Sequence, residues 1–399
     1  MPTGSKSPGE GSALSAYGVE ITGGGLGPPP VIWALAMKID GRALFLAPSM
    51  ATEERREVLS AGAGLAAEVA LETGAELGAV EIRARGYWEQ VWRRFRRDKV
   101  AIVSGVFIVL LVAAAFAGAP IAARWLGHGP DDIFPTSGVN QTTLVPVGPW
   151  TRAYDFTEQK EVFFPLGASD TLGRDEFLRL LYGARVSLEV AVGATLVSML
   201  LGVLLGATAG FFRGWVDSVI SRLTEIVMAF PVLLFVIALA ATAGDRLNDI
   251  TLGIFPKGVI TLVLVGGIFG WFYPARIVRA QVLSLREKEF VEAARMIGAS
   301  DWRIIRSHLL PHLVAPIIVY STLIVAQFVL FEAGLSFLGL GIELPTASWG
   351  SLLSTAPQFY TQQPWLMVWP GLAVLLTTLA FNLLGDGLRD AFDPRSSTS

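Results

Sequence analysis

Residues 100–123 read VAIVSGVFIVLLVAAAFAGAPIAA, a stretch without a single charged side chain. The hydrocarbon core of a bilayer is about 30 Å thick, so a helix of about 20 apolar residues crosses it. Inside hydrocarbon every backbone N–H and C=O must find a partner within the segment, which a helix provides. The stretch therefore predicts a membrane-spanning helix and decides the fold class.

Five further stretches have the same character, at residues 190–212, 226–244, 258–275, 313–331 and 365–384. The composition agrees, because 52% of the 399 residues are hydrophobic and only 16% are charged, with a mean hydropathy of +0.54. Soluble domains carry about 25% charged residues on average. A soluble enzyme is therefore disfavoured, and the sequence predicts an all-α membrane protein with six transmembrane helices.

Basic residues gather directly before the first span, at Arg93, Arg94, Arg96, Arg97 and Lys99. Because such clusters stay on the cytoplasmic side, we expect a multi-pass protein of the cytoplasmic (inner) membrane, surrounded by the lipid bilayer, with both termini in the cytoplasm. The net charge of −3 gives no preference for nucleic acid. The absence of cysteine and the presence of only three histidines argue against a metal site.

The predicted spans divide the chain into four parts. Residues 1–80, rich in Gly, Ser and Pro at their start, are predicted to be a flexible N-terminal extension. Residues 81–123 hold the cytoplasmic flank and the first span, residues 124–185 form an external loop or cap, and residues 186–394 form a core with five further spans. The external part is much longer than ordinary connections, which indicates a function of its own.

Two external segments, residues 124–185 and 339–364, offer large surfaces outside the membrane. Asp170 or Thr171 is expected to cap the helix that enters the membrane from the first segment. We expect six apolar residues of this segment to be buried together as a small cap: Val145, Val147, Trp150, Phe156, Val162 and Phe163. The second segment is almost uncharged and is predicted to dip toward the path between the spans.

The cytoplasmic segment 283–311 predicts a pair of short helices. The first, at about 287–297, stops at Gly298, which suits a left-handed position after a helix end. Ser300 is expected to cap the second helix, and Pro311 to limit it. Phe290, Val291, Ala294 and Ile297 share one face of the first helix by their spacing. A projecting helix pair of this kind suits docking into the groove of a partner.

Three motifs in this order resemble those of one known family. Glu292-Ala293-Ala294 with Gly298 and Leu310-Pro311 resembles the EAA motif of ABC importer permeases, although His308 stands where the general pattern has an isoleucine-like residue. TLGRD at 171–175, YGAR at 182–185 and GLSFLGLG at 334–341 are similar to the peptide-transporter branch. The resemblance covers residues 86–394.

The resemblance implies the type I ABC importer permease fold, with cytoplasmic coupling helices and transport by alternating access. It implies as partners a second homologous permease, two cytosolic ABC ATPases and an external solute-binding protein. The chain has no phosphate-binding loop, so it is expected not to be an enzyme. ATP and Mg are expected on the ATPases, and no cofactor is expected in this chain. Six residues are implied to couple the chain to the ATPases: Glu292, Ala293, Ala294, Gly298, Leu310 and Pro311.

The implied solutes are dipeptides, oligopeptides or peptide-like molecules, with glutathione, a nickel chelate or an oligosaccharide as alternatives. Gly173, Arg174, Asp175 and Arg185 are interpreted either as a structural ion network at the membrane rim or as contacts to the solute or its binding protein. Trp349 is expected to lie on the external docking surface. Glu332 is a candidate for the translocation path, because ionisable groups within spans are functional candidates.

Two other classes of membrane protein fit the sequence less well than an importer. An ion-coupled secondary transporter usually has ionisable residues at mid-membrane and internal repeats, whereas these spans have almost no charge and no visible repeat. A membrane scaffold would have no need for a helix–glycine–helix segment opposite two elaborate external loops. Purification of a tagged chain distinguishes the three, since only an importer retains ATPases and a second permease.

Overall fold

The computed structural model describes residues 87–393, apart from 158, 230, 232, 233, 236, 239–241 and 243–255. Among these residues five helices are long and apolar enough to cross a membrane: Lys99–Leu126, Glu176–Phe212, Val259–Leu285, Asp301–Phe337 and Trp365–Phe392. They correspond to five of the six expected spans. About half of the remaining one, 226–244, lies outside the described residues, as does the whole of the expected extension 1–80.

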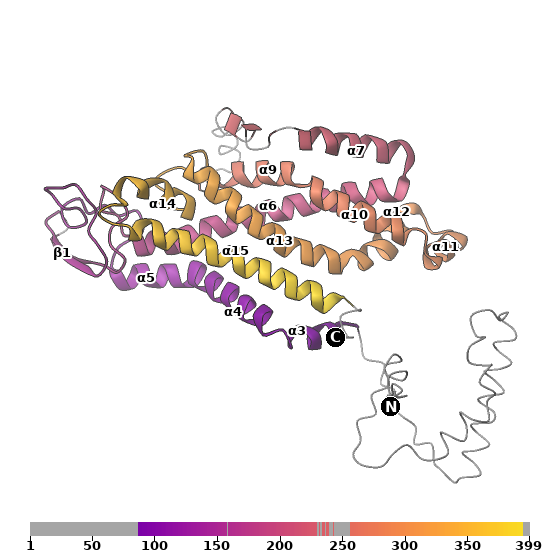
Figure 1. The fold of residues 1–399 in the computed structure, drawn as a ribbon, viewed down its shortest axis with the longest axis horizontal. Coiled ribbons are helices and arrows are strands. Elements are labelled where there is room, and N and C mark those ends of the chain that lie inside the picture. The colour runs from indigo at the N-terminus through magenta and orange to yellow at the C-terminus, as the bar shows by residue number, and fades with distance from the viewer. Residues whose placement is uncertain are drawn as a thin grey trace, which may run out of the picture. The chain divides into compact units, whose positions relative to one another are not determined.

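The first span consists of α4 (Lys99–Ala113), a π-helical turn (Ala114–Gly118) and α5 (Ala119–Leu126). It begins where it does because the Asp98 carboxylate accepts hydrogen bonds from the N–H groups of Val100 and Ala101, at 2.9 and 3.1 Å. A short helix, α3 (Tyr87–Phe95), precedes it. In Figure 1 the first span runs beside the last helix, α15 (Trp365–Phe392), against which it packs.

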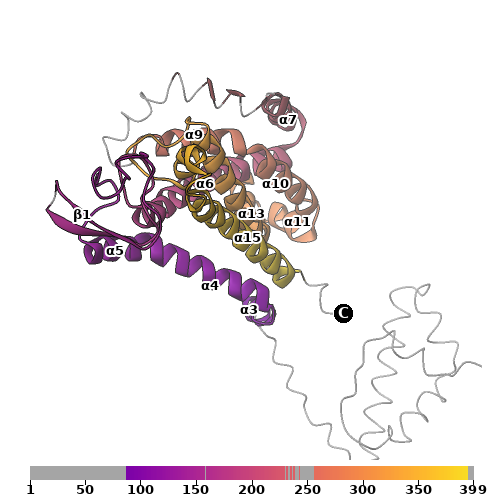
Figure 2. The ribbon, with the colours of Figure 1, turned by 60° about the vertical axis from the view of Figure 1, so that its left-hand side comes forward.

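The longest helix, α6 (Glu176–Phe212), lies in the middle of the bundle. It packs against α9 (Val259–Gly270), α10 (Phe272–Leu285) and α13 (Leu310–Phe337). Small residues every fourth position allow close approach to α10, since a Cβ on Gly210 would lie 2.8 Å from the Arg279 backbone oxygen. Helix α7 (Gly214–Ala229) follows at the edge of the bundle (Figure 2).

Pro311 does not end its helix, contrary to expectation. Helix α12 (Asp301–Arg303), a π-helical turn (Ile304–Leu309) and α13 form one continuous helical span. A proline removes one backbone donor and crowds the preceding turn, and a wider π turn is a common way to accommodate that disturbance. The same arrangement occurs before Pro120 in the first span.

The segment between the first span and α6 folds around a hairpin. Strand β1 (Thr151–Asp155) pairs antiparallel with β2 (Lys160–Phe164), with Thr151 opposite Phe164. Phe134, Val162, Phe164 and Ala168 form its core. The expected apolar cap is therefore partly wrong, because Trp150 and Phe156 are 77% and 75% exposed.

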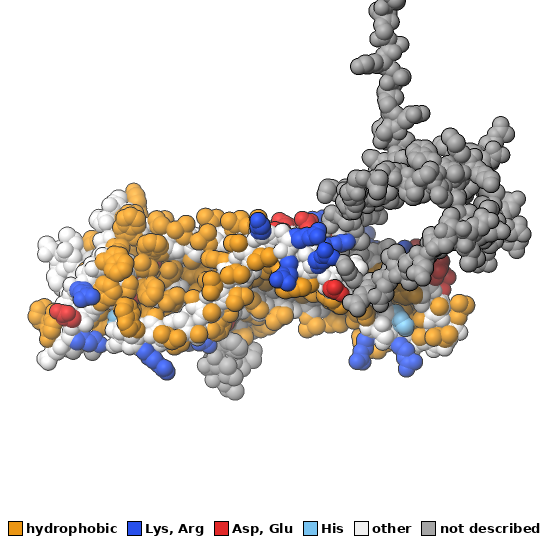
Figure 3. All heavy atoms as spheres, turned by 90° about the horizontal axis from the view of Figure 1, so that it is seen from below, with side chains coloured by type: hydrophobic (Ala, Val, Ile, Leu, Met, Phe, Trp, Pro, Cys, Tyr) orange, Lys and Arg blue, Asp and Glu red, His pale blue; other side chains and the backbone are white. Residues whose placement is uncertain are grey.

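The spans bury small and apolar residues between them and expose large apolar ones around them. Figure 3 shows hydrophobic side chains over most of one side of the bundle, as a lipid-facing surface requires. The hairpin and the short helix α14 (Trp349–Thr355), followed by a 3-10 turn (Ala356–Phe359), lie at one end of the bundle. Helix α11 (Glu289–Met296) and α3 lie at the other (Figure 1). We call these the hairpin end and the α11 end.

Candidate functional site

The segment around α11 has the predicted helix–glycine–helix form. Gly298 has a φ of +81°, and the N–H groups of Gly298 and Ala299 donate to the carbonyls of Arg295 and Ala294 at 2.9 and 3.0 Å. These two bonds define a Schellman motif, which ends a helix sharply. A Cβ at Gly298 would meet no atom within 4 Å, so glycine is needed there for its backbone conformation and not for space.

One face of α11 is buried within the chain itself. Val291 and Ala294 pack with Ile304, Ile305 and Leu309 in a cluster that also includes residues of α6 and α10. Ala294 therefore contacts its own chain, and only Ala293 of the expected small pair is exposed. Ile297 is not on the buried face, contrary to its spacing, because it is the C-cap residue, where the backbone leaves the helical path.

The opposite side of the same segment is exposed and apolar at its tip. Met296, Ile297 and Trp302 are 83%, 84% and 59% exposed, and Glu292 is exposed beside them. We call these three apolar residues the α11 tip. Of the other predicted coupling residues, Pro311 is exposed, whereas Leu310 is partly buried against the cluster beneath α11. A rigidly held apolar tip indicates a protein contact.

At the hairpin end, Asp175 is the residue that caps α6, in place of the expected Asp170 or Thr171. Its carboxylate accepts from Leu178 N–H at 2.9 Å, and the ring of His128 lies at hydrogen-bond distance, 3.2 Å. Helix α6 thus begins before 186, the predicted boundary of the core. The Asp170 carboxylate instead pairs with the Arg174 guanidinium at 2.5 Å, with both side chains largely buried.

Gly173, between these residues, has a φ of +76°. An added Cβ would overlap the backbone oxygen of Phe134, so glycine is required for both conformation and space. The turn of Gly173, Arg174 and Asp175 is therefore part of the packed structure that starts α6. These contacts agree with the interpretation as a structural ion network.

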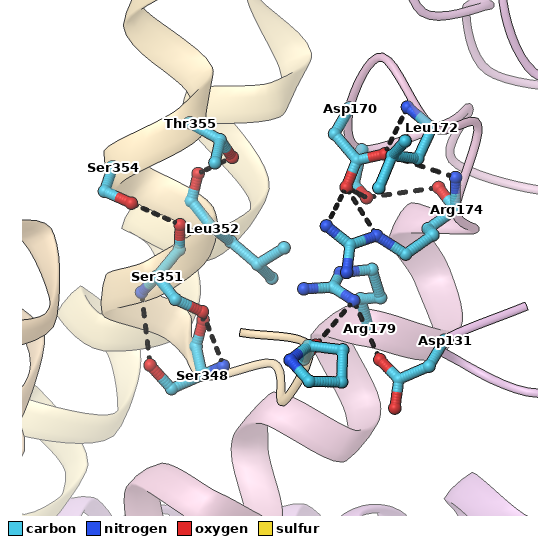
Figure 4. A network of polar contacts seen from close by, with 12 residues as sticks. Asp131, Asp170, Leu172, Arg174, Arg179, Ser348, Ser351, Leu352, Ser354 and Thr355 are labelled. Atoms are coloured by element: carbon cyan, nitrogen blue, oxygen red, sulfur yellow. Dashed lines mark hydrogen bonds and ion pairs between the residues drawn. The ribbon is translucent and has the colours of Figure 1, made fainter. Parts of the chain in front are cut away.

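Arg179 was not singled out from the sequence, although it links three parts of the chain (Figure 4). Its guanidinium donates to Asp131 at 3.0 Å and to the backbone carbonyl of Pro345 at 3.1 Å. A buried arginine requires partners, and those of Arg179 lie 48 and 166 residues away in the sequence, so no local pattern identifies them.

Arg185 lies six residues farther along α6 and is half exposed. It pairs with Glu189 at 2.8 Å, and its guanidinium lies 5.2 Å from the centre of the Phe116 ring. With Glu189, Tyr182 and Asp131 it lines an open recess of about 490 Å³. Of the four predicted rim residues, Arg185 is thus the one whose charged group faces open space.

Glu332 is fully buried, and its carboxyl group faces two serines. Ser187 of α6 and Ser336 of α13 each donate to it at 2.7 Å. The two serines in turn accept from the N–H groups of Trp349 and Ile342, at 3.3 and 3.2 Å. We call Arg179, Ser187, Glu332, Ser336 and their partners in residues 342–349 the polar network. Glu332 is thus enclosed by its own chain, and its place on a translocation path stays a prediction.

Trp349 is 1% exposed, so the prediction that its side chain lies on an external docking surface is wrong. Its indole N–H donates to the Leu180 carbonyl at 3.2 Å. The backbone there is fixed by Ser348, whose hydroxyl accepts from Ser351 N–H at 3.1 Å while Ser351 accepts in return (Figure 4). This reciprocal cap could have been suspected from the Ser-x-x-Ser spacing.

These features define a class: an integral membrane protein with a polar network at one end of its spans and a projecting helix pair with an exposed apolar tip at the other. The matches to known families are more specific. A family described as "Binding-protein-dependent transport system inner membrane component" matches residues 202–398, and "N-terminal TM domain of oligopeptide transport permease C" matches residues 86–141.

The chain belongs to this family of binding-protein-dependent inner membrane components, the permeases of ABC importers. Two similar proteins are the glutathione transport system permease proteins GsiD of Pectobacterium atrosepticum and Escherichia coli O6:K15:H31. Both are 37% identical to it, over 77% and 78% of this chain and 91% and 92% of their own length. A solved chain of the MetNI methionine ABC transporter in an inward-facing conformation is 17% identical, with a TM-score of 0.43 over 54% of this chain and 97% of its own.

Proposed function

We propose that this chain is one of two permease subunits of an importer for glutathione or other short peptides. The similarity to the GsiD permeases supports the solute class, because it extends over more than nine tenths of their length. The chain provides half of the translocation path, and an external binding protein selects and delivers the solute. The chain itself is not catalytic.

The observation that carries the coupling role is the α11 tip. Met296, Ile297 and Trp302 project from a helix end that is fixed by a Schellman motif and by a buried face. Apolar side chains on a projecting helix pair fit a groove of a partner protein. In the proposed mechanism, each of two cytosolic ATPases binds ATP and Mg, and the one beneath this chain holds the α11 tip.

The connection from the tip to the spans is short, which favours transmission of movement. Ile304, Ile305 and Leu309, which pack under α11, belong to the same continuous helical segment as α13. A displacement of α11 therefore reaches the span without passing a flexible loop. Coupling between distant sites needs an element with two arrangements that both sites bias, and α13 is that element in this proposal.

The α11 end is cytoplasmic in this proposal, and both chain termini with it. The basic residues Arg93, Arg94, Arg96, Arg97 and Lys99 flank the first span at the α11 end, and basic flanks are retained in the cytoplasm. The hairpin end then faces outward. Trp150, Tyr154 and Phe156, which are exposed on and beside β1, replace Trp349 as the proposed contacts to the binding protein.

The test is reconstitution of the whole transporter. The tagged full-length chain is purified from cells that express it with the genes beside it, and uptake of labelled glutathione is measured in proteoliposomes that contain ATP. We expect two ATPases and a second permease to co-purify and uptake to need both the binding protein and ATP. Uptake of short peptides but not glutathione would revise the solute, whereas absence of ATPases would contradict the proposal.

A further inference from the structure

Helix α3 combines basic and aromatic side chains on its exposed surface. Tyr87, Trp88 and Trp92 are 55%, 59% and 59% exposed, and Arg93 is exposed beside them. Only Val91 of this helix is buried. An exposed tryptophan pair on a soluble surface is unfavourable, whereas indole rings prefer the level of the lipid headgroups.

The arginines of α3 line a recess. Arg93, Arg94 and Arg97, together with Glu89 and Gln90, surround an open volume of about 330 Å³. Arg94 also donates to the backbone oxygen of Asp393 at 2.7 Å, which fixes its guanidinium. Within the described part of the chain, Arg93 and Arg97 have no carboxylate within ion-pair distance. The recess therefore has an excess of positive charge.

Packing on α15 fixes the orientation of this recess. Val91 is buried, and the Trp88 ring lies edge-to-face on Phe392 with ring centres 6.1 Å apart. Helix α3 is thus held between the start of the first span and the end of the last one. The arginines are presented by packed structure and not by a loose tail, which lowers the entropy lost when a ligand binds.

The position of the recess relative to the bilayer follows from the residues directly after it. Asp98 caps the first span, which begins at Lys99, so Arg97 lies next to the first residues that enter hydrocarbon. Figure 3 shows basic side chains gathered beside the broad hydrophobic surface of the bundle. Side chains at this position reach the phosphates of the lipid headgroups.

We propose that the recess formed by Arg93, Arg94 and Arg97 binds the phosphate of an anionic phospholipid, with Trp88 and Trp92 inserted among the neighbouring lipids. Charge complementarity selects this ligand, because the glycerol phosphate of phosphatidylglycerol has no compensating cation, whereas phosphatidylcholine has one. Guanidinium groups bind phosphate through paired N–H donors. This inference goes beyond the transport function and does not depend on which solute is carried.

The test measures lipid binding to the transporter complex that contains the full-length chain, in a neutral detergent, by native mass spectrometry. The probe is dioctanoyl phosphatidylglycerol, compared with dioctanoyl phosphatidylcholine and with inorganic phosphate as competitor. A basic residue near an anionic surface contributes about 1 kcal/mol, or about fivefold in affinity. The double variant R93Q/R97Q is therefore expected to bind phosphatidylglycerol about 25-fold more weakly.

A matched control removes two arginines from the opposite end of the chain. R124Q/R152Q changes the net charge equally and is expected to leave the affinity unchanged, because both residues lie at the hairpin end. R93K/R97K keeps the charge but not the paired donors, so its affinity should fall between those of the unchanged protein and R93Q/R97Q, which separates loss of the site from misfolding. W88A/W92A should weaken binding of the lipid without changing any charge.

Three results would overturn the proposal. They are equal binding of phosphatidylglycerol by R93Q/R97Q and the unchanged protein, equal binding of phosphatidylcholine and phosphatidylglycerol, and displacement of the lipid by inorganic phosphate at comparable concentration. The last result would indicate a free-phosphate site in which the tryptophans have no part.

Discussion

The polar network lies at the hairpin end of the bundle, and the α11 tip lies at the other end. The two regions differ in burial: the network buries charged and polar side chains, whereas the tip exposes apolar ones. In the network, Arg179 and Glu332 are buried and hydrogen-bonded to other elements of the chain. At the α11 tip, large apolar side chains are exposed although the helix beneath them is firmly packed. Buried charged side chains are tolerated only when their hydrogen-bonding groups are in place. Exposed apolar side chains are removed from water only when another protein covers them. The comparison shows one region completed by its own chain and another that requires a second protein.

Replacing Gly298 with Val gives the largest expected effect. A β-branched residue at a φ of +81° is strained by about 2 kcal/mol, so the Schellman turn opens and the α11 tip is misplaced. We expect ATP-driven uptake to fall at least about tenfold while the chain remains in the membrane. Gly334→Ala is the control, because Gly334 lies inside α13 with no atom within 4 Å of an added Cβ. Normal uptake by G298V would remove the α11 segment from the coupling route.

Substituting one tryptophan at each end sharpens the comparison. Trp349→Ala leaves a cavity among buried residues, which costs about 3–5 kcal/mol of stability. Trp302→Ala removes a side chain that is 59% exposed, so the melting temperature should stay unchanged while the affinity for the ATPases falls. Thermal unfolding and co-purification of the ATPases measure the two effects. If W302A lowers the melting temperature as much as W349A does, the contrast between the ends is wrong.

Substituting one glutamate in each region compares the buried polar network with the exposed α11 segment. Glu332→Gln places an amide nitrogen, which cannot accept a hydrogen bond, where one of the two carboxyl oxygens accepts from a serine hydroxyl, and the loss of that buried hydrogen bond should cost about 1–2 kcal/mol. Glu292→Gln changes an exposed residue, so it should leave thermal stability unaltered and weaken only ATPase coupling. Chemical unfolding of both variants gives the stabilities, and stimulated ATP hydrolysis gives the coupling.

Acidification should lower the melting temperature by a smaller amount, through the ion pair of Asp217 near the start of α7. Hydrogen bonds from Arg279 to the Asp217 carboxylate, at 2.5 and 2.7 Å, lower the pKa of Asp217 from its ordinary value of 3.8. A lowered folded-state pKa contributes stability above the unfolded pKa, and this contribution is lost as the pH falls through the folded value. The melting temperature of the unchanged protein should therefore fall more steeply below about pH 4 than that of Asp217→Asn. Identical acid profiles would contradict this assignment.

Removing residues 1–78 is expected to have the smallest effect. The basic flank and α3, which begins at Tyr87, remain in the shortened chain, so insertion and uptake should be unchanged. Uptake in proteoliposomes and recovery of the assembled complex measure this. Loss of assembly would mean that the N-terminal extension has a function of its own.

The sequence alone determined the membrane class, most of the spans and the glycine turn after α11. Each of these depends on local chemistry: an uncharged run of sufficient length, or the need for a left-handed residue where a helix ends. Gly298 is an example, because its conformation is decided by the residues on either side of it. The family motifs likewise lie within short segments.

Local sequence patterns gave wrong predictions for residues whose conformation or burial depends on tertiary packing. Pro311 usually ends a helix, but a π turn from Ile304 to Leu309 lets this helix continue. Trp349 is part of an external segment by sequence, yet it is buried against α6. In both cases the pattern describes a tendency of the isolated segment, and packing against neighbouring helices overrides it.

Only the tertiary structure decided the polar network. Ser336 lies one turn from Glu332 and could have been paired with it by helical spacing. Ser187, however, is 145 residues away from Glu332, and Arg179 meets Pro345 across 166 residues. Such contacts exist because close packing of α6 against α13 and the segment before α14 places their polar groups together in a medium that does not tolerate them unpaired.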